Sequence, residues 1–190
     1  MQLKKMTLAN KITISRILLI PIFIIFLVYG YRNDLFLFRN IAFGIFILSM
    51  LTDALDGMVA RVFKQQTELG SLLDPLADKL LLVAAFVVIG YVGKISLGIV
   101  ILVVSREIIM VLGWTILHIF SSNTLTIKPS ILGKLTTAFQ MLTIIYCLIE
   151  ITNPIVIRYV IITTMVIFTI ASTLHYIFVG SRILNEGKIR

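Results

Sequence analysis

Four aspartates stand in a part of the chain that is otherwise apolar enough to lie in a lipid bilayer. They are Asp53, Asp56, Asp74 and Asp78, within the stretch LTDALDGMVARVFKQQTELGSLLDPLADKLLLV. A charged aspartate at the centre of a membrane span costs about 2.5–3.5 kcal/mol on insertion scales, so acids at that depth are candidates for function. Four carboxylates that converge would also repel one another unless a cation lay between them.

The spacing of the acids predicts two helical stripes. The first has offsets of 0, 3, 4, 7 and 8, which fall on one face of a helix, and it contains Asp53, Asp56, Gly57, Ala60 and Arg61. The second has offsets of 0, 4 and 8 and contains Gly70, Asp74 and Asp78. Residues 62–69, VFKQQTEL, are polar enough to turn at the membrane surface. The two helices should therefore run antiparallel, with stripes that can face each other.

A hard divalent cation would relieve the repulsion, and four acids can hold one or two Mg²⁺ ions. Gly57, Ala60 and Gly70 leave room for a ligand against the backbone, or for close helix packing. Arg61 can bind a phosphate with two parallel hydrogen bonds. Helix packing explains the small residues alone, but it does not explain four acids on matched stripes beside one arginine. The pattern predicts a metal site for a diphosphate.

The composition supports a membrane location for these helices. Of the 190 residues 59% are hydrophobic, against about 45–50% in a typical soluble domain. One cysteine, Cys147, cannot form an intrachain disulfide, and with only His118 and His175 beside it a zinc site is disfavoured. The net charge of +8 comes without a basic cluster interleaved with aromatics, which indicates contact with anionic lipid and no nucleic-acid partner.

We expect an all-α integral membrane protein with six transmembrane helices in one domain of residues 1–190. A span needs about 20 mainly apolar residues. Six segments meet this requirement: 12–30, 36–60, 72–92, 95–119, 131–151 and 154–178. Pro21 should bend the first span without ending it. Residues 1–10 suit either a short interfacial helix or a frayed terminus.

The distribution of Lys and Arg predicts the orientation. With the N-terminus in the cytoplasm, twelve of the 17 basic residues fall at cytoplasmic ends and four at the opposite ends, while Arg106 lies within a span. This asymmetry favours a cytoplasmic location for both termini and for the acidic site.

The acidic stretch also resembles a known family. It reads D-x-x-D-G-x-x-A-R-x8-G-x3-D-x3-D without a departure, which is the signature of the CDP-alcohol phosphotransferases, integral membrane enzymes of phospholipid synthesis. The six predicted spans and the cytoplasmic site match that family, so the resemblance covers nearly the whole chain. It implies a location in the bacterial cytoplasmic membrane and a homodimer, for which the apolar third and fourth spans offer surface.

The resemblance implies a role for each residue of the motif. The donor would be CDP-diacylglycerol, with its diphosphate bridged by Mg²⁺ or Mn²⁺, two ions being expected. Asp53, Asp56, Asp74 and Asp78 would be metal ligands, and Asp78 would also be the general base. Gly57, Ala60, Arg61 and Gly70 would contact the nucleotide and diphosphate. The run NKITISR resembles the family's N-x-x-T-x-x-R element, so Asn10 and Thr13 would line the nucleotide site, although Asn10 also suits a helix N-cap.

The acceptor has to be sought among the remaining polar residues. Arg106 and Lys134, at membrane depth and without an obvious acid partner, would grip a phosphate, unless Glu107 neutralises Arg106. Thr137 and Arg182 are further candidates, although snorkelling at the interface also explains Arg182. Arg106-Glu107, Gly133-Lys134, Thr137 and Gln140 together resemble the phosphatidylglycerophosphate synthases, a branch of the family in which a second Lys usually stands where this chain has Thr136.

That branch implies sn-glycerol 3-phosphate as the acceptor, although inositol phosphate, phosphatidylglycerol and serine remain open. A cation transporter is the alternative from another class. Transporters commonly have a midplane site between repeated halves, whereas these acids occur once, in one hairpin, near one membrane face.

Overall fold

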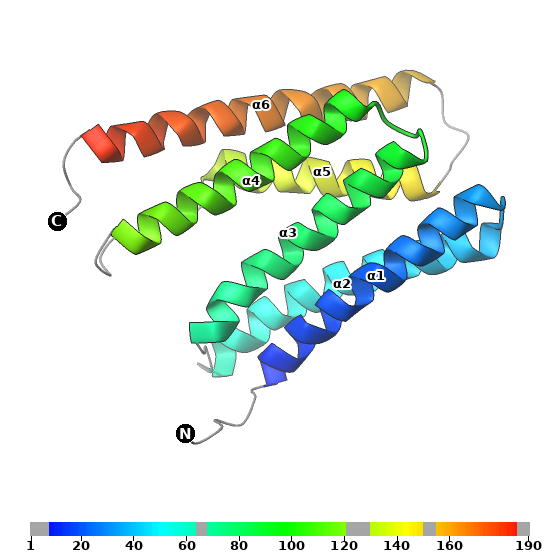
Figure 1. Cartoon of the computed structure of the whole chain (residues 1–190), viewed down its shortest axis with the longest axis horizontal. Coiled ribbons are helices and arrows are strands. Elements are labelled where there is room, and N and C mark those ends of the chain that lie inside the picture. Colours follow the sequence, from blue (N-terminus) through cyan, green and yellow to red (C-terminus); the bar gives the residue numbers. More distant parts are fainter. Residues whose placement is uncertain (1–7, 64–67, 121–129, 150–154, 186–190) are drawn as a thin grey trace. The chain divides into compact units, whose positions relative to one another are not determined.

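The computed structural model is all-helical in the part of the chain that it describes. It describes the backbone of residues 8–63, 68–120, 130–149 and 155–185, and the side chains of residues 14–52, 79–113, 130–149 and 155–181. The helices are α1 (Leu8–Arg32), α2 (Phe36–Phe63), α3 (Glu68–Tyr91), α4 (Leu97–Phe120), α5 (Ile131–Ile149) and α6 (Ile155–Asn185) (Figure 1). Each predicted span corresponds to one helix. The bounds differ most for α1 and α6, because a helix continues into polar residues beyond the apolar segment that hydropathy detects.

Among the residues that the structure describes, three helical segments are long and apolar enough to cross a membrane. They are Ile14–Arg32, Ile131–Ile149 and Ile155–Ser181. Phe36–Thr52 and Lys79–Tyr91 are shorter apolar helices. These segments support a membrane protein, and the number of six transmembrane spans stays a prediction.

Helices α1 and α3 end with the same hydrogen-bond pattern. The backbone N–H of Leu35 donates to the carbonyl of Gly30 at 2.9 Å, and that of Lys94 donates to the carbonyl of Ile89 at 3.0 Å. The residue before each donor is left-handed, Asp34 with φ 53° and Gly93 with φ 75°. This conformation stops a helix and reverses the chain, and Asp tolerates it better than most side chains do. Helix α2 can therefore follow α1 after three residues and run back along it.

The helices form two compact units, which we call the N-terminal unit (α1–α3) and the C-terminal unit (α4–α6). In the N-terminal unit α1 packs against both α2 and α3. Its buried positions recur at helical spacing, with Phe23 and Leu27 on α1 and Ala42 and Phe46 on α2. The rings of Phe23 and Phe46 lie 6.0 Å apart between centroids. The described core of this unit is mainly apolar.

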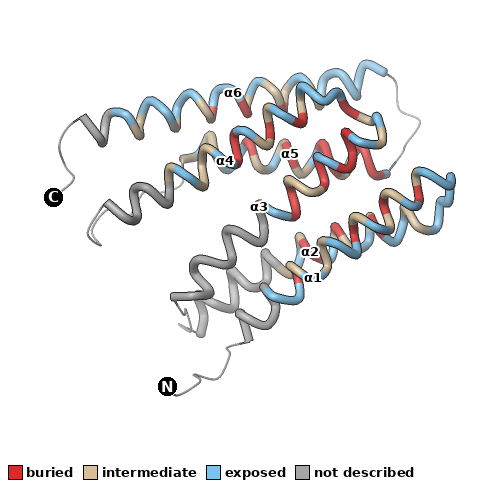
Figure 2. The backbone as a smooth tube through the Cα atoms, viewed as in Figure 1, coloured by how far each residue is buried: buried red, intermediate tan, exposed pale blue. Residues whose placement is uncertain are grey.

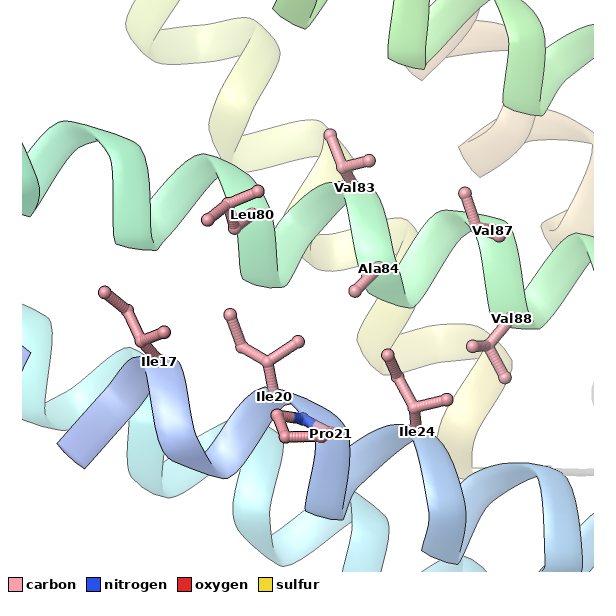
Figure 3. A pocket seen from close by; sticks show the side chains of 9 residues that line it. All are labelled: Ile17, Ile20, Pro21, Ile24, Leu80, Val83, Ala84, Val87 and Val88. Carbon is pink, nitrogen blue, oxygen red and sulfur yellow. The ribbon is translucent and has the colours of Figure 1, made fainter. Parts of the chain in front are cut away.

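An apolar groove runs between α1 and α3 in the N-terminal unit (Figure 3). Its volume is about 420 Å³, and its nine lining residues are Ile17, Ile20, Pro21, Ile24, Leu80, Val83, Ala84, Val87 and Val88. Helix α1 continues through Pro21, as predicted. The lining contains no polar side chain, so the groove offers an apolar surface and no group that could act in catalysis.

The C-terminal unit has a more polar core. Helix α6 packs against both α4 and α5, and most of its surface is exposed (Figure 2). The buried polar residues described in the C-terminal unit are Arg106, Glu107, Thr136, Gln140, Thr143, Thr169 and Ser172. The Thr136 hydroxyl lies 3.0 Å from the Phe168 carbonyl of α6, and Phe139 stacks on Phe168 with 4.7 Å between ring centroids. A hydrogen bond and a ring stack therefore help to join α5 to α6.

We predict that Gly30→Ala destabilises the N-terminal unit. A Cβ at Gly30 would lie 2.9 Å from both the backbone nitrogen and Cγ of Arg39, and the backbone atom cannot move aside cheaply. Overpacking of this kind costs about 1–3 kcal/mol, so the melting temperature in detergent should fall.

Gly44→Ala is the matched control, because a Cβ there would meet nothing within 4 Å. Alanine is a better helix former than glycine by about 1 kcal/mol, so this variant should melt at the same or a higher temperature. Equal melting temperatures for the two variants would contradict the predicted close approach of α1 and α2.

Candidate active site

The acidic motif lies on two helices of the N-terminal unit, as its spacing predicts. The last turns of α2 carry Asp53, Asp56, Gly57, Ala60 and Arg61, and the first turns of α3 carry Gly70, Asp74 and Asp78. The side chains of these eight residues lie outside the described ones. Their presence on helices is confirmed, while the convergence of their carboxylates stays a prediction.

The order of the helices brings these segments to one end of the unit. Helix α2 ends at Phe63 and α3 begins at Glu68, so only four residues connect them. Helix α1 runs antiparallel to α2, which puts the beginning of α1 beside the end of α2 (Figure 1). Asn10 and Thr13 lie in that first part of α1. The predicted nucleotide and metal residues therefore occupy helix ends that the topology keeps together.

Asn10 does not cap α1. The helix begins at Leu8, so Asn10 lies inside its first turn and not before it. The N-cap interpretation of Asn10 is therefore wrong. Its predicted role beside the nucleotide, with that of Thr13, falls on side chains outside the described ones.

The donor set of the motif suits a hard divalent cation. Four carboxylates supply oxygen ligands, which Mg²⁺ and Mn²⁺ prefer, and two adjacent helices can present them to shared ions. Within the described side chains, no group of three or more His, Cys, Asp or Glu residues is placed to hold a metal. Because of its four carboxylates, the acidic motif is the metal site that the sequence predicts.

Arg106 and Glu107 form a buried ion pair in α4. Their exposed fractions are 2% and 3%, and the Arg106 Nη1 donates a hydrogen bond to the Glu107 Oε1. The expectation that Arg106 lacks an acid partner is therefore wrong, and the alternative that Glu107 neutralises it is confirmed. Of the three guanidinium nitrogens, only Nη1 donates a hydrogen bond to Glu107. The Nε and Nη2 atoms of Arg106 are buried and have no hydrogen-bond partner among the residues that the structure describes.

The N-terminus of α5 lies close to those free donors. Ser130 caps the helix, since its Oγ accepts a hydrogen bond from the Gly133 backbone N–H at 3.0 Å. A Cβ on Gly133 would lie 4.0 Å from the Arg106 Nη2, so the missing side chain leaves the guanidinium group next to the first turn of α5. A helix N-terminus carries partial positive charge, and here it adjoins a cation with free donors. Together they put two hydrogen-bond donors without described partners beside the partial positive charge of a helix end.

Two of the other predicted acceptor residues lie on the same part of α5. Lys134 is exposed in the first turn, one residue beyond Gly133. Thr137 is half-buried one turn further on, and its hydroxyl lies 3.1 Å from the Gly133 carbonyl. Arg182 lies near the end of α6, and its side chain is outside the described ones. The structure thus brings Arg106 close to the helical turn that carries Lys134, and it does not test Arg182.

The site residues predicted from the sequence do not include Ser130, and Gln140 enters only through the resemblance to the phosphatidylglycerophosphate synthases. Ser130 stands directly before an apolar helical run, which is a signal for an N-cap that could have been recognised. Gln140 is fully buried in α5, with neither amide atom hydrogen-bonded to any described group. Periodicity alone could not reveal this burial, because it does not say which face of a lone helix is covered.

Comparison with known proteins identifies the chain's relatives. The sequence model of the family described as CDP-alcohol phosphatidyltransferase matches residues 6–172. A Mycobacterium tuberculosis protein named "Probable phosphatidylglycerophosphate synthase" is 30% identical over 185 residues, covering 96% of this chain and 85% of that protein.

Two further relatives differ in their names. The Bacillus subtilis "CDP-diacylglycerol--glycerol-3-phosphate 3-phosphatidyltransferase" is 34% identical over 146 residues, which covers 72% of this chain and 74% of that protein. The human "Cardiolipin synthase (CMP-forming)" is 32% identical over 154 residues, covering 72% of this chain and 48% of that protein. The family match extends over most of the chain and includes both acidic helices. This chain belongs to the CDP-alcohol phosphatidyltransferase family, whose members are transferases that in general depend on a divalent metal.

Proposed function

We propose that the protein transfers a phosphatidyl group from CDP-diacylglycerol to sn-glycerol 3-phosphate, giving phosphatidylglycerophosphate and CMP. The observation that carries the choice of acceptor is the buried Arg106 guanidinium group, with two free donor atoms beside the capped N-terminus of α5. These donors suit the phosphate that glycerol 3-phosphate already carries. The names of several relatives support the same choice.

The acidic motif accounts for the donor in this proposal. Asp53, Asp56, Asp74 and Asp78 would hold Mg²⁺ or Mn²⁺, with two ions expected, and Gly57, Ala60, Arg61, Gly70, Asn10 and Thr13 would contact the nucleotide and its diphosphate. When bound, the metal would supply positive charge that neutralises the diphosphate and stabilises the leaving oxygen.

Asp78 is the proposed general base. Its carboxylate accepts the proton of the acceptor hydroxyl while the hydroxyl oxygen forms a bond to the lipid-side phosphorus. The bond from that phosphorus to the bridging oxygen breaks, and CMP leaves with the electron pair. Arg61 neutralises part of the charge on the departing phosphate. Phosphoryl transfer depends mainly on positioning and charge neutralisation, and this set of residues supplies both.

The acceptor phosphate is assigned to Arg106, Lys134, Thr137 and Arg182. Arg106 offers Nε and Nη2, and the first turn of α5 adds the partial charge of its N-terminus. Lys134 adds a full charge close to that turn. A phosphate bound there would satisfy donors that no described group of the protein satisfies.

We also propose a homodimer in the bacterial cytoplasmic membrane, with both termini and the acidic motif on the cytoplasmic side. The basic residues support this orientation. Helix α4 exposes Leu97, Ile101, Ile108 and Leu112 at helical spacing, an apolar surface that suits either a second copy or lipid. One-sided labelling of a terminal cysteine in sealed vesicles tests the orientation, and the mass of the solubilised particle tests the dimer.

The proposed reaction predicts that CMP is released only when CDP-diacylglycerol, sn-glycerol 3-phosphate and a divalent cation are all present. Purified protein in detergent should be assayed against a panel of glycerol 3-phosphate, inositol 1-phosphate, serine and phosphatidylglycerol. Faster turnover with another acceptor would assign the protein to a sister activity of the family. Metal flux into liposomes without any CDP-lipid would instead support the transporter alternative.

We predict that Asp78→Asn abolishes turnover while the protein still folds and binds nucleotide. Loss of a general base lowers kcat by about 10²–10⁴-fold, because the amide cannot accept the proton. Asp34→Asn is the matched control, since Asp34 is 91% exposed in the α1–α2 turn and Asn also tolerates its left-handed backbone. Normal turnover by the Asp78 variant would exclude Asp78 as the base.

We predict that the double substitution Arg106→Gln, Glu107→Gln raises KM for glycerol 3-phosphate by about 10–100-fold, the effect of losing charge-assisted hydrogen bonds. Both residues are changed because removal of Arg106 alone would leave a buried carboxylate without its partner. KM for CDP-diacylglycerol should stay the same. Arg39→Gln removes an arginine of the N-terminal unit as a control, and the assignment fails if the double variant keeps the wild-type KM for the acceptor.

A further inference from the structure

Gln140 differs from the threonines buried in the C-terminal unit. The hydroxyls of Thr136, Thr143 and Thr169 each lie 2.8 Å from the carbonyl oxygen four residues earlier in their own helix. Gln140 is 0% exposed, and neither its Oε1 nor its Nε2 has a hydrogen-bond partner in the described part of the chain. A buried amide without partners costs free energy that an apolar side chain of similar size would avoid.

Gln140 shares one side of α5 with the proposed phosphate site. It follows Gly133 by seven residues, which is close to two helical turns, and Thr137 lies between them. Side chains on a helix tilt toward its N-terminus, so the amide of Gln140 is carried back toward Thr137 and Gly133. The Arg106 Nη2 lies 4.0 Å from where a Gly133 Cβ would stand. Arg106 of α4 therefore lies beside the Gly133 turn of α5, and Gln140 lies about two turns further along the same side of α5.

The separation suits a small phosphorylated polyol. Seven residues of α-helix rise by about 10 Å between Cα atoms, and the tilted glutamine shortens the gap to its amide. A phosphate at Arg106 would leave a chain of a few carbon atoms to run along α5. An amide both donates and accepts hydrogen bonds, which matches a hydroxyl group that does the same.

We propose that Gln140 is a specificity-determining residue that binds a hydroxyl group of the acceptor while Arg106 binds its phosphate. The ligand class is a phosphate monoester of a short polyol. This inference rests on the proposed function and adds the residue that distinguishes the polyol from phosphate alone.

The test compares two anions that differ only in the part Gln140 would bind. The affinities of sn-glycerol 3-phosphate and inorganic phosphate are measured by calorimetry on the full-length protein in detergent. The wild-type protein should bind glycerol 3-phosphate more tightly. Gln140→Leu should weaken glycerol 3-phosphate binding about tenfold, the effect of one lost hydrogen-bonding group, and leave phosphate binding unchanged. Its melting temperature without ligand should not fall, because a buried amide without partners has been removed.

Thr143→Val is the matched control, since Thr143 is buried on the next turn of α5 and its hydroxyl already has a partner. Both affinities should stay at wild-type values. Gln140→Met is the second variant if the branched leucine does not fit, because its unbranched side chain follows the path of glutamine without its hydrogen bonds.

Three results would overturn the inference. Wild-type affinity of both Gln140 variants for glycerol 3-phosphate would remove Gln140 from the site. An equal loss for both anions, with a lower melting temperature, would make Gln140 a structural residue of the core. A wild-type protein that does not bind glycerol 3-phosphate would overturn the proposed acceptor as well, which separates the failure of the function from the failure of Gln140 alone.

Discussion

An arginine and a glutamate are buried side by side in α4, and much of the C-terminal unit can be understood from that pair. Two charges taken out of water are costly unless each finds a partner, and Glu107 gives Arg106 that partner on one side only. The planar guanidinium group keeps Nε and Nη2 for another acceptor, and these atoms have none in the described structure. Neutralisation keeps the arginine buried, and its two remaining donor atoms are those that the proposed phosphate would use.

The two units solve the problem of buried polar groups differently. In the described part of the N-terminal unit the core is mainly apolar, with residues such as Phe23, Leu27 and Phe86. In the C-terminal unit, threonine hydroxyls donate hydrogen bonds to the carbonyl oxygen of the preceding helical turn, as those of Thr143 and Thr169 do. Gln140 and Arg106 carry more donors and acceptors than a helix backbone can satisfy. The atoms that remain without partners in the described structure are the ones to which we assign the acceptor.

The sequence predicted the helices better than the contacts between them. Apolar runs of span length predict each of the six helices in the described part of the chain, and the acids Asp53, Asp56, Asp74 and Asp78 lie on α2 and α3 as their spacing predicts. The sequence offers the pairing of Arg106 with Glu107 only as an alternative, and neighbouring residues on a helix do not usually face each other. The burial of Gln140 depends on how α5 packs against other helices. Hydropathy cannot show that, since the lipid-facing and core-facing sides of a membrane helix are both apolar.

Thr136 shows how packing and recognition are linked at the start of α5. The resemblance to the phosphatidylglycerophosphate synthases implies a lysine at this position, whereas Thr136 is fully buried and its hydroxyl lies 3.0 Å from the Phe168 carbonyl of α6. A lysine there would carry its ammonium group into the contact between two helices. With Thr136 the chain has a helix contact here and no cation. In addition, Glu107 neutralises the charge of Arg106. The proposed site must therefore bind its anion less by net charge than by fixed donors, those of Arg106 and of the capped first turn. Hydrogen bonds of fixed direction depend on the shape of the ligand, whereas net charge attracts any anion. A site built in this way can distinguish one phosphate ester from another.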